Sequence, residues 1–198
     1  PQTGTGRLQM SKLVEPTKYL RGTLYPPPDK SISHRAAILN SLASGEAIIE
    51  NFSDGYDCSS TLECLNLLGV TTDKTEHFNG STKTTTLRIK SPGLQNFTEP
   101  PDVMDCGNSG TTMRFVMGLL SAVPFVSVVS GDSSLRSRPM GRIVKPLSLM
   151  GAQIIGRSGD SLAPLTIKGS QLKGISYELP VASAQLKSSL IIAGIHAD

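Results

Sequence analysis

Three helix openings along the chain combine small polar residues with a cation, a pattern that could hold an anion. They are Cys-Gly-Asn-Ser-Gly-Thr-Thr-Met-Arg over 106–114, Asp-Lys-Ser-Ile-Ser-His-Arg over 29–35, and Ala-Ser-Ala-Gln-Leu-Lys over 182–187. Glycine lets a backbone approach a ligand closely, and the free N–H groups at a helix start favour negative charge. Three such openings at near-regular spacing predict a site for a small anionic ligand.

An arginine cluster adds a further candidate for anion binding. Arg138 stands directly before Pro139, and proline is common in the first turn of a helix, so we expect a helix to begin there. Arg138 would then lie beside a helix N-terminus, where an anion is favoured. Arg136 and Arg142 are expected on a solvated face, because runs of charge usually are. We likewise expect His34 on the surface of its helix, without an acid–base role.

The composition is that of an ordinary globular protein and favours small ligands. The 198 residues are 38% hydrophobic and 18% charged, which suffices for one large domain or two small ones. The net charge of +3 is modest and interspersed, which suits a small anion better than nucleic acid. No apolar run approaches the ~20 residues of a membrane span, and no charged-then-apolar leader precedes the first helix. We therefore expect a cytoplasmic protein with neither nucleic-acid nor membrane partners.

The cysteines and histidines predict neither a disulfide framework nor a metal site. Cys58, Cys64 and Cys106 are few, odd in number and lack a CxxC pair. Cys64 is expected in the core. Cys106 is either a nucleophile or a packed thiol, and the packed thiol is favoured. The histidines are scattered along the chain, so no metal and no cofactor is expected.

The order of predicted elements repeats along the chain. After a polar stretch over 1–11, the pattern predicts a helix over 31–44 with Ala36, Leu39 and Ala43 inward and a strand over 46–51. A helix capped by Asp57 or Ser59 and ending at Gly69 follows, then strands over 70–74 and 84–90. The second half predicts a helix over 109–122, a strand over 125–130, a helix over 139–150 and strands over 153–157 and 165–168.

Matching segments about 80 residues apart indicate an internal duplication. Leu87-Arg88-Ile89-Lys90 corresponds to Leu165-Thr166-Ile167-Lys168, and Arg35 corresponds to Arg114. The chain is therefore predicted to be α/β, with two full βαβαββ units. A third copy begins at Ile175 and includes a helix over 183–195 with Leu186, Leu190 and Ile191 inward.

The helix openings and the Arg138-Pro139-Met140-Gly141-Arg142 segment together resemble the 5-enolpyruvylshikimate-3-phosphate synthase family. The resemblance runs from about Leu20 to the end, in the family's order and near its spacing. Family members are longer and have two similar lobes, each an inside-out α/β barrel of three βαβαββ units. The resemblance therefore implies a partial N-terminal lobe over 21–198, preceded by a polar leader over 1–20.

The resemblance also implies an activity and a set of ligand-binding residues. The family is a transferase of the shikimate pathway of chorismate and aromatic amino-acid biosynthesis. It joins phosphoenolpyruvate to the 5-hydroxyl of shikimate 3-phosphate and releases phosphate, without metal or redox cofactor. The residues it assigns to substrate binding are Lys30, Ser31, Arg35, Asn108, Gly110, Thr111, Arg138, Ser183, Ala184 and Gln185. Lys30 and Gln185 would reach both ligands, whereas Gly110 and Arg138 would line the phosphoenolpyruvate pocket.

Two departures and two alternatives accompany this resemblance. Pro28 stands where the family commonly has glycine, and Phe115 stands where some members have proline. The neighbourhood of Phe115 influences binding of the herbicide glyphosate in the family, so glyphosate sensitivity stays open.

A UDP-N-acetylglucosamine enolpyruvyl transferase is disfavoured, because Ser31 and Ser133 stand where that enzyme has asparagine and a reactive cysteine. The other alternative is a lobe that binds phosphate esters without turnover. The family's catalytic acid and base groups belong to a C-terminal lobe, which would be a partner if it is a separate chain.

Overall fold

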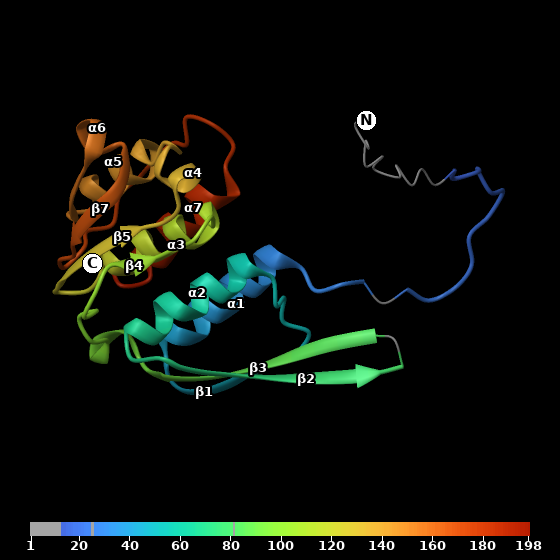
Figure 1. Cartoon of the computed structure of the whole chain (residues 1–198). Coiled ribbons are helices and arrows are strands. Elements are labelled where there is room, and N and C mark those ends of the chain that lie inside the picture. Colours follow the sequence, from blue (N-terminus) through green and yellow to red (C-terminus); the bar gives the residue numbers. More distant parts are fainter. Residues whose placement is uncertain (1–12, 25, 81) are drawn as a thin grey trace, which may run out of the picture.

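The computed structural model describes residues 13–24, 26–80 and 82–198, so the predicted frayed start over 1–11 lies outside the described residues. Residues 13–24 run away from the body of the chain with their side chains exposed (Figure 1). None of the described helices combines the length and apolar character needed to cross a membrane.

The first half of the chain forms an antiparallel sheet covered on one face by two helices (Figure 1). The strands are β1 (Ser44–Ile49), β2 (Thr71–Asn79) and β3 (Thr82–Pro92), in the order β1-β3-β2. The helices are α1 (Lys30–Leu42) and α2 (Tyr56–Leu67), and a single 3-10 turn, η1 (Leu94–Asn96), follows β3. Leu87 and Ile89 of β3 point into the core with no exposed surface, which confirms the predicted strand.

The second half forms a four-stranded sheet. Its strands are β4 (Met104–Asp105), β5 (Val126–Ser130), β6 (Gln153–Gly156) and β7 (Leu162–Lys168), in the order β4-β5-β7-β6. The pair β4–β5 is parallel and the other pairs are antiparallel. The helices are α3 (Gly110–Leu120), α4 (Ser133–Arg136), α5 (Gly141–Leu149), α6 (Arg157–Asp160) and α7 (Ala184–Gly194).

Helix α3 lies at the centre of the molecule, between α2 of the first half and α7 (Figure 1). Ten of its eleven residues are buried. Close packing against α7 is possible because Gly118 has no side chain, and a Cβ there would collide with the Ser189 backbone carbonyl. The Ser189 hydroxyl also donates to the Arg114 carbonyl at 2.7 Å. The position of α7 is therefore fixed relative to α3.

Side chains cap the starts of the three helices whose sequences indicated anion binding. Asp29 Oδ1 accepts from Ile32 N at 2.6 Å, Ser109 Oγ from Thr112 N at 3.1 Å, and Ser183 Oγ from Leu186 N at 3.2 Å. These bonds satisfy backbone donors that an uncapped helix start leaves free.

The predicted side-chain cap of α2 is wrong. The capping position is Gly55, which makes no side-chain cap bond, and Asp57 lies in the first turn. Its carboxylate instead pairs with Lys30 Nζ at 2.8 Å. An acidic residue in the first turn still favours the helix through the helix dipole.

Some of the predicted inward faces and one helix start are also wrong. Leu39 is 44% exposed and Ile191 is 61% exposed, whereas His34 is fully buried. The face of α1 that packs against α2 and α3 is partly polar, so an apolar stripe could not identify it. Helix α5 begins at Gly141 instead of Pro139, because the chain first forms the short helix α4.

Candidate functional site

The start of α3 is built around Gly110, whose missing side chain admits two arginines. A Cβ on Gly110 would lie 2.7 Å from Arg114 Nη1 and 3.4 Å from Arg138 Nη1. The guanidinium groups of both arginines therefore lie against the first turn of the helix. Free N–H groups and two cations at one helix start favour an anion strongly.

Asn108 ties Arg138 to the loop that precedes α3. Its Oδ1 accepts from Arg138 Nη2 at 2.7 Å, and its Nδ2 donates to Asp132 Oδ2 at 2.6 Å. The bond from Asn108 lowers the pKa of Asp132, as do the Leu135 backbone N–H and the charge of Arg138. Asn108 thereby fixes the Arg138 side chain beside the start of α3. Arg138 itself precedes the start of α5 by three residues.

Gln185 joins the start of α7 to α3. Its Oε1 accepts from Arg114 Nη1 at 2.6 Å, and its Nε2 donates to Thr111 Oγ1 at 2.9 Å. Both ends of the amide are thus occupied by α3, although α3 and α7 are far apart in the sequence. The structure brings two of the three predicted helix openings together through this one side chain.

A cavity of about 240 Å³ opens where α3, α5 and α7 meet. Its lining residues are Arg114, Pro139, Arg142, Ile143, Ser183, Gln185 and Leu186. Arg142 is exposed, as its place in a charge run predicted, yet its side chain contributes to this cavity. This volume can hold a small anionic metabolite.

Positive charge around this cavity is not neutralised by the protein. Burial lowers the pKa of Arg114, and the nearby charges of Arg138 and Arg142 lower it further. None of these three arginines forms an ion pair with any residue that the structure describes. A bound anion would relieve this mutual repulsion, because an opposite charge stabilises the charged form.

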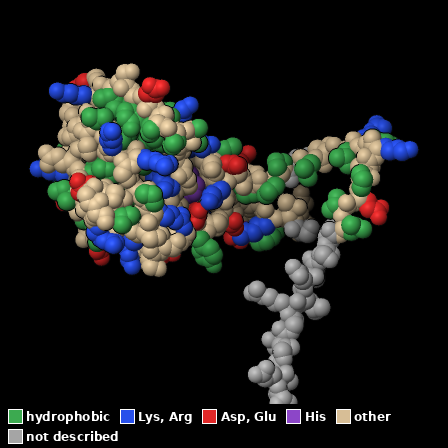
Figure 2. Space-filling model, turned by 90° about the horizontal axis from the view of Figure 1, so that it is seen from above, with side chains coloured by type: hydrophobic (Ala, Val, Ile, Leu, Met, Phe, Trp, Pro, Cys, Tyr) green, Lys and Arg blue, Asp and Glu red, His purple; other side chains and the backbone are tan. Residues whose placement is uncertain are grey.

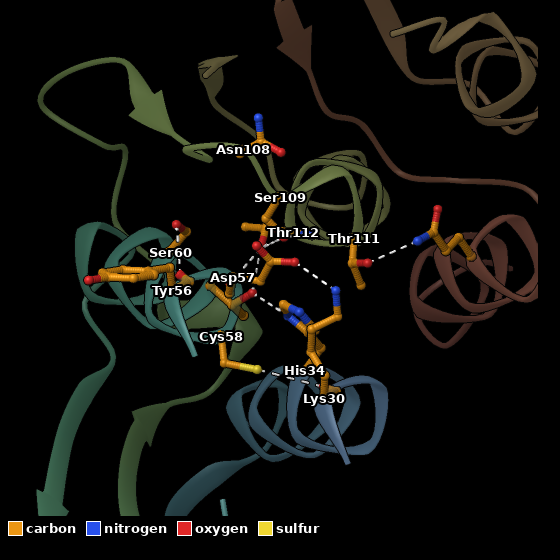
Figure 3. A network of polar contacts seen from close by, with 12 residues as sticks. Lys30, His34, Tyr56, Asp57, Cys58, Ser60, Asn108, Ser109, Thr111 and Thr112 are labelled. Carbon is orange, nitrogen blue, oxygen red and sulfur yellow. Dashed lines mark hydrogen bonds and ion pairs between the residues drawn. The ribbon is translucent and has the colours of Figure 1, made fainter. Parts of the chain in front are cut away.

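The third helix opening, at α1, lies beside α2. Figure 3 shows the Lys30 amine paired with Asp57 and pointing toward the start of α3. The Lys30 side chain remains 54% exposed and can reach a ligand. Ser31 and Arg35 form no side-chain hydrogen bond or ion pair within the described ranges, and Ala184 is exposed at the start of α7.

The surface around these elements carries dispersed charge. On the face seen in Figure 2, Lys and Arg side chains lie among apolar and small polar ones instead of forming an unbroken band. The described residues contain no group of three or more His, Cys, Asp or Glu side chains placed to hold a metal ion.

The cysteines are buried thiols. Cys58, Cys64 and Cys106 are all free and inaccessible. A hydrogen bond with Cys64 and burial raise the pKa of the Cys106 thiol well above its ordinary value. This environment favours the packed thiol over the nucleophile, because a nucleophilic cysteine needs a stabilised thiolate.

Two residues of the site, Asp57 and Arg142, were missed by sequence reasoning as ligand-binding candidates. Arg114, one helical turn after Gly110, was instead the cation of the opening over 106–114 that the sequence predicted to hold an anion. Asp57 and Arg142 gave no such signal, because their roles depend on the meeting of helices that are distant in sequence.

Comparisons with known proteins show which family the chain is similar to. A family model for EPSP synthase (3-phosphoshikimate 1-carboxyvinyltransferase) matches residues 14–198. The 3-phosphoshikimate 1-carboxyvinyltransferase of Pelotomaculum thermopropionicum is 52% identical over 185 residues, which are 93% of this chain and 41% of the relative. That of Desulforudis audaxviator is 51% identical over 96% of this chain and 42% of its own length.

Solved structures give the same result. An EPSP synthase from Acinetobacter baumannii superimposes with a TM-score of 0.80 at 40% identity, covering 89% of this chain and 38% of that chain. The present chain therefore spans about two-fifths of the length of these relatives.

Proposed function

From the premise that the chain belongs to the EPSP synthase family, we propose that it is the shikimate-3-phosphate-binding part of a 3-phosphoshikimate 1-carboxyvinyltransferase. The complete enzyme transfers the enolpyruvyl group of phosphoenolpyruvate to the 5-hydroxyl of shikimate 3-phosphate and releases phosphate. It thereby serves the shikimate pathway of aromatic amino-acid biosynthesis. A cytoplasmic location, expected from the sequence, remains a prediction.

The observation that carries this proposal is the uncompensated positive cavity between α3, α5 and α7. Arg114 and Arg142 line it, and the capped starts of α3 and α7 are joined beside it by Gln185. A phosphate ester needs cations and preorganised N–H donors, and arginine offers a planar fork for two oxygens. These features support binding of an anionic ester and do not depend on the family comparison.

The proposed roles divide between the two ligands. Ser183, Ala184 and Gln185 at the start of α7 hold shikimate 3-phosphate, together with Ser31 and Arg35 of α1. Gly110 and Arg138 bind phosphoenolpyruvate. Asn108 orients the Arg138 side chain, and Thr111 orients that of Gln185. Lys30 bridges the two anions as a point charge. Such fixed donors stabilise charge that moves between phosphate and carboxylate in the transition state.

The finer fold proposal is a repeated βαβαββ unit within an inside-out α/β barrel. Its support is that β1-β3-β2 and β5-β7-β6 have the same strand order and the same antiparallel pairing. The order α1, β1, α2, β2, β3 of the first half corresponds to α3, β5, α5, β6, β7 of the second half, which has β4 and the short helices α4 and α6 in addition. We take α7 as the beginning of a third unit, although residues 173–183 form no strand before it.

We further propose that turnover requires the rest of the longer relatives. The family's acid and base groups belong to the second lobe, and proton transfer needs such groups in position. That lobe is then a partner of this chain, either as a continuation or as a separate polypeptide. The alternative is a lobe that binds phosphate esters without catalysis, which fits a chain spanning 41% of a relative.

A phosphate-release assay distinguishes these functions. The purified chain with shikimate 3-phosphate and phosphoenolpyruvate is expected to release no phosphate above background. Addition of the second lobe of a close relative as a separate chain is expected to restore release. Turnover by the chain alone would contradict the proposal that catalysis requires the second lobe. Ligand binding without restored turnover would favour the non-catalytic alternative.

A further inference from the structure

A buried chain of polar side chains connects α1, α2 and α3 beneath the candidate site. His34 Nδ1 lies 2.7 Å from Thr61 Oγ1, which lies 2.7 Å from Thr112 Oγ1. Thr112 Oγ1 in turn lies 2.7 Å from Ser109 Oγ and 3.1 Å from the Asp57 carbonyl oxygen. All four side chains are at most 1% exposed. We call these four residues the hydroxyl relay, of which Figure 3 labels His34, Ser109 and Thr112.

None of the roles proposed above uses His34, Thr61 or Thr112. Burying polar groups is costly unless they are hydrogen-bonded, so such a network stabilises one arrangement of its helices only when its bonds are made. The edge of the His34 ring also meets Phe115 of α3, with ring centroids 6.4 Å apart and planes at 86°. His34 therefore contacts both α2 and α3 from α1.

The acceptors fix the direction of the relay. The Thr112 hydroxyl has one proton, which is directed at the Asp57 carbonyl oxygen and at Ser109 Oγ, so the Thr112 oxygen accepts from Thr61. The Thr61 hydroxyl is then used as a donor, and its oxygen accepts from His34 Nδ1–H. The opposite direction would lose the bond to Asp57.

The other ring nitrogen agrees with this direction. Among the described residues His34 Nε2 is buried and has no hydrogen-bond partner. In the assignment above it carries only a lone pair. In the reverse assignment it would carry a buried N–H without an acceptor, and an unsatisfied donor costs the desolvation of that group.

The Thr112 end of the relay lies at groups of the candidate site. Ser109 Oγ accepts from Thr112 N and caps α3 immediately before Gly110. The Thr112 hydroxyl also contacts the Asp57 carbonyl oxygen in the first turn of α2, and the Asp57 carboxylate pairs with Lys30 Nζ at 2.8 Å. The relay thus joins the cation of α1 to the anion-binding start of α3.

We propose that His34 is a positioning residue, whose Nδ1–H anchors the hydroxyl relay that sets Lys30 and Asp57 relative to the first turn of α3. This inference rests on the proposed function, because its consequence is the placement of Lys30, which bridges both ligands, relative to the start of α3, which binds phosphoenolpyruvate. A neutral ring is required. Burial lowers the pKa of His34 to about 4, the charges of Lys30 and Arg35 act in the same direction, and Asp57 opposes them.

Two matched pairs of variants test the proposal in the 198-residue chain. Thr61→Val interrupts the relay with little change of shape, whereas Thr61→Ser keeps the hydroxyl. His34→Leu removes the anchor, whereas His34→Asn keeps an N–H near the position of Nδ1. Loss of one hydrogen bond corresponds to about fivefold to tenfold in affinity. We expect Thr61→Val and His34→Leu to bind shikimate 3-phosphate about fivefold to tenfold more weakly than the parent. Thr61→Ser and His34→Asn should bind it within about threefold of the parent affinity.

Ser127→Ala is the control. Its hydroxyl is buried on β5 and has no partner within the described part of the chain, so affinity should stay unchanged. Equal affinity of Thr61→Val and Thr61→Ser, with both folded, would overturn the positioning role. Equal weakening by Ser127→Ala would also overturn it, because the effect would then be a general loss of stability.

A spectroscopic measurement separates this inference from the proposed function. In the 15N-labelled parent chain without ligand, the His34 imidazole pattern should be that of the Nδ1–H tautomer at pH 7. The amides of Lys30 and Gly110 should shift in Thr61→Val and return in Thr61→Ser. An Nε2–H tautomer or unshifted amides would overturn the inference. A parent chain that binds no shikimate 3-phosphate, with these signals as expected, would instead overturn the proposed function and leave the relay established.

Discussion

At the scale of single residues, the site depends on arginines that form no ion pair with any carboxylate in the described part of the chain. The arginine of the Arg138-Pro139 pair was predicted to bind an anion, and the structure places its side chain on Asn108 and close to Gly110. Arg142 was expected only on a solvated face. It lines the cavity because α7 brings Ser183 and Gln185 to the opposite side, and sequence spacing gives no sign of that meeting.

Replacement of Arg142 with glutamine should weaken the binding of shikimate 3-phosphate. A hydrogen bond to a charged group contributes about 1.5–3 kcal/mol, and the lower value applies to an exposed side chain, so we expect roughly a tenfold loss of affinity. Isothermal titration of the variant measures this directly. Arg88→Gln is the control, since Arg88 lies on β3 and pairs with Glu46 at 3.9 Å. An equal loss at both positions would indicate a general effect of net charge.

His34 also makes stability depend on pH. Its pKa is 6.5 when unfolded and about 4 when folded, so between these values the unfolded state binds more protons. The free energy of unfolding therefore rises with pH in this window. The contribution is fully present above about pH 6.5 and is lost as the pH falls to 4, by on the order of 3 kcal/mol.

Urea unfolding of the parent and of His34→Asn between pH 4 and pH 7 measures this contribution. Carboxylates with lowered pKa values, such as Asp54 and Asp132, affect both proteins alike and cancel in the difference. The parent should lose stability relative to the variant as the pH falls. A constant difference across the window would show that His34 titrates normally in the folded chain.

At the scale of elements, the packing of α3 against α7 assembles half of the site. Gly118→Ala should force these helices apart, because the added methyl group collides with the Ser189 carbonyl. Overpacking of this kind costs about 1–3 kcal/mol. Thermal or urea unfolding would measure the loss, and the bond between Arg114 and Gln185 should weaken with it.

The matched control is Gly194→Ala at the end of α7. Nothing lies within 4 Å of a Cβ at that position. Alanine there should leave stability unchanged or raise it slightly, since glycine is the poorer helix former. Similar destabilisation by both variants would mean that glycine acts through the backbone and not through the contact between helices.

Elements defined by local patterns were predicted well from the sequence, and their mutual contacts were not. The helices that begin next to Ser109 and Ser183 and the strand through Leu87 and Ile89 follow from local residue types. The prediction that His34 lies on the helix surface was wrong, because the buried face of α1 is partly polar and includes His34. The partners of that face, on α2 and α3, are 27 residues or more away, and an apolar period carries no information about them.

At the scale of the whole molecule, the candidate site is divided between the two halves of the chain. Lys30 and Asp57 come from the helices of the first sheet, whereas the cavity belongs to α3, α5 and α7. The fold class and the family followed from the helix openings and their order along the chain. The assembly of the openings through Gln185 and the hydroxyl relay depends on contacts between distant residues, which only the structure provides.

The most direct test of this account is an NMR titration of the chain with shikimate 3-phosphate. Amides at residues 30–35 and 183–187 should shift first and together, with weak affinity, because the ligand would contact the helix openings of α1 and α7. Phosphoenolpyruvate should bind more weakly still. Shifts confined to residues outside these openings, or no shifts at millimolar shikimate 3-phosphate, would contradict the assignment of this chain as the shikimate-3-phosphate-binding part of the enzyme.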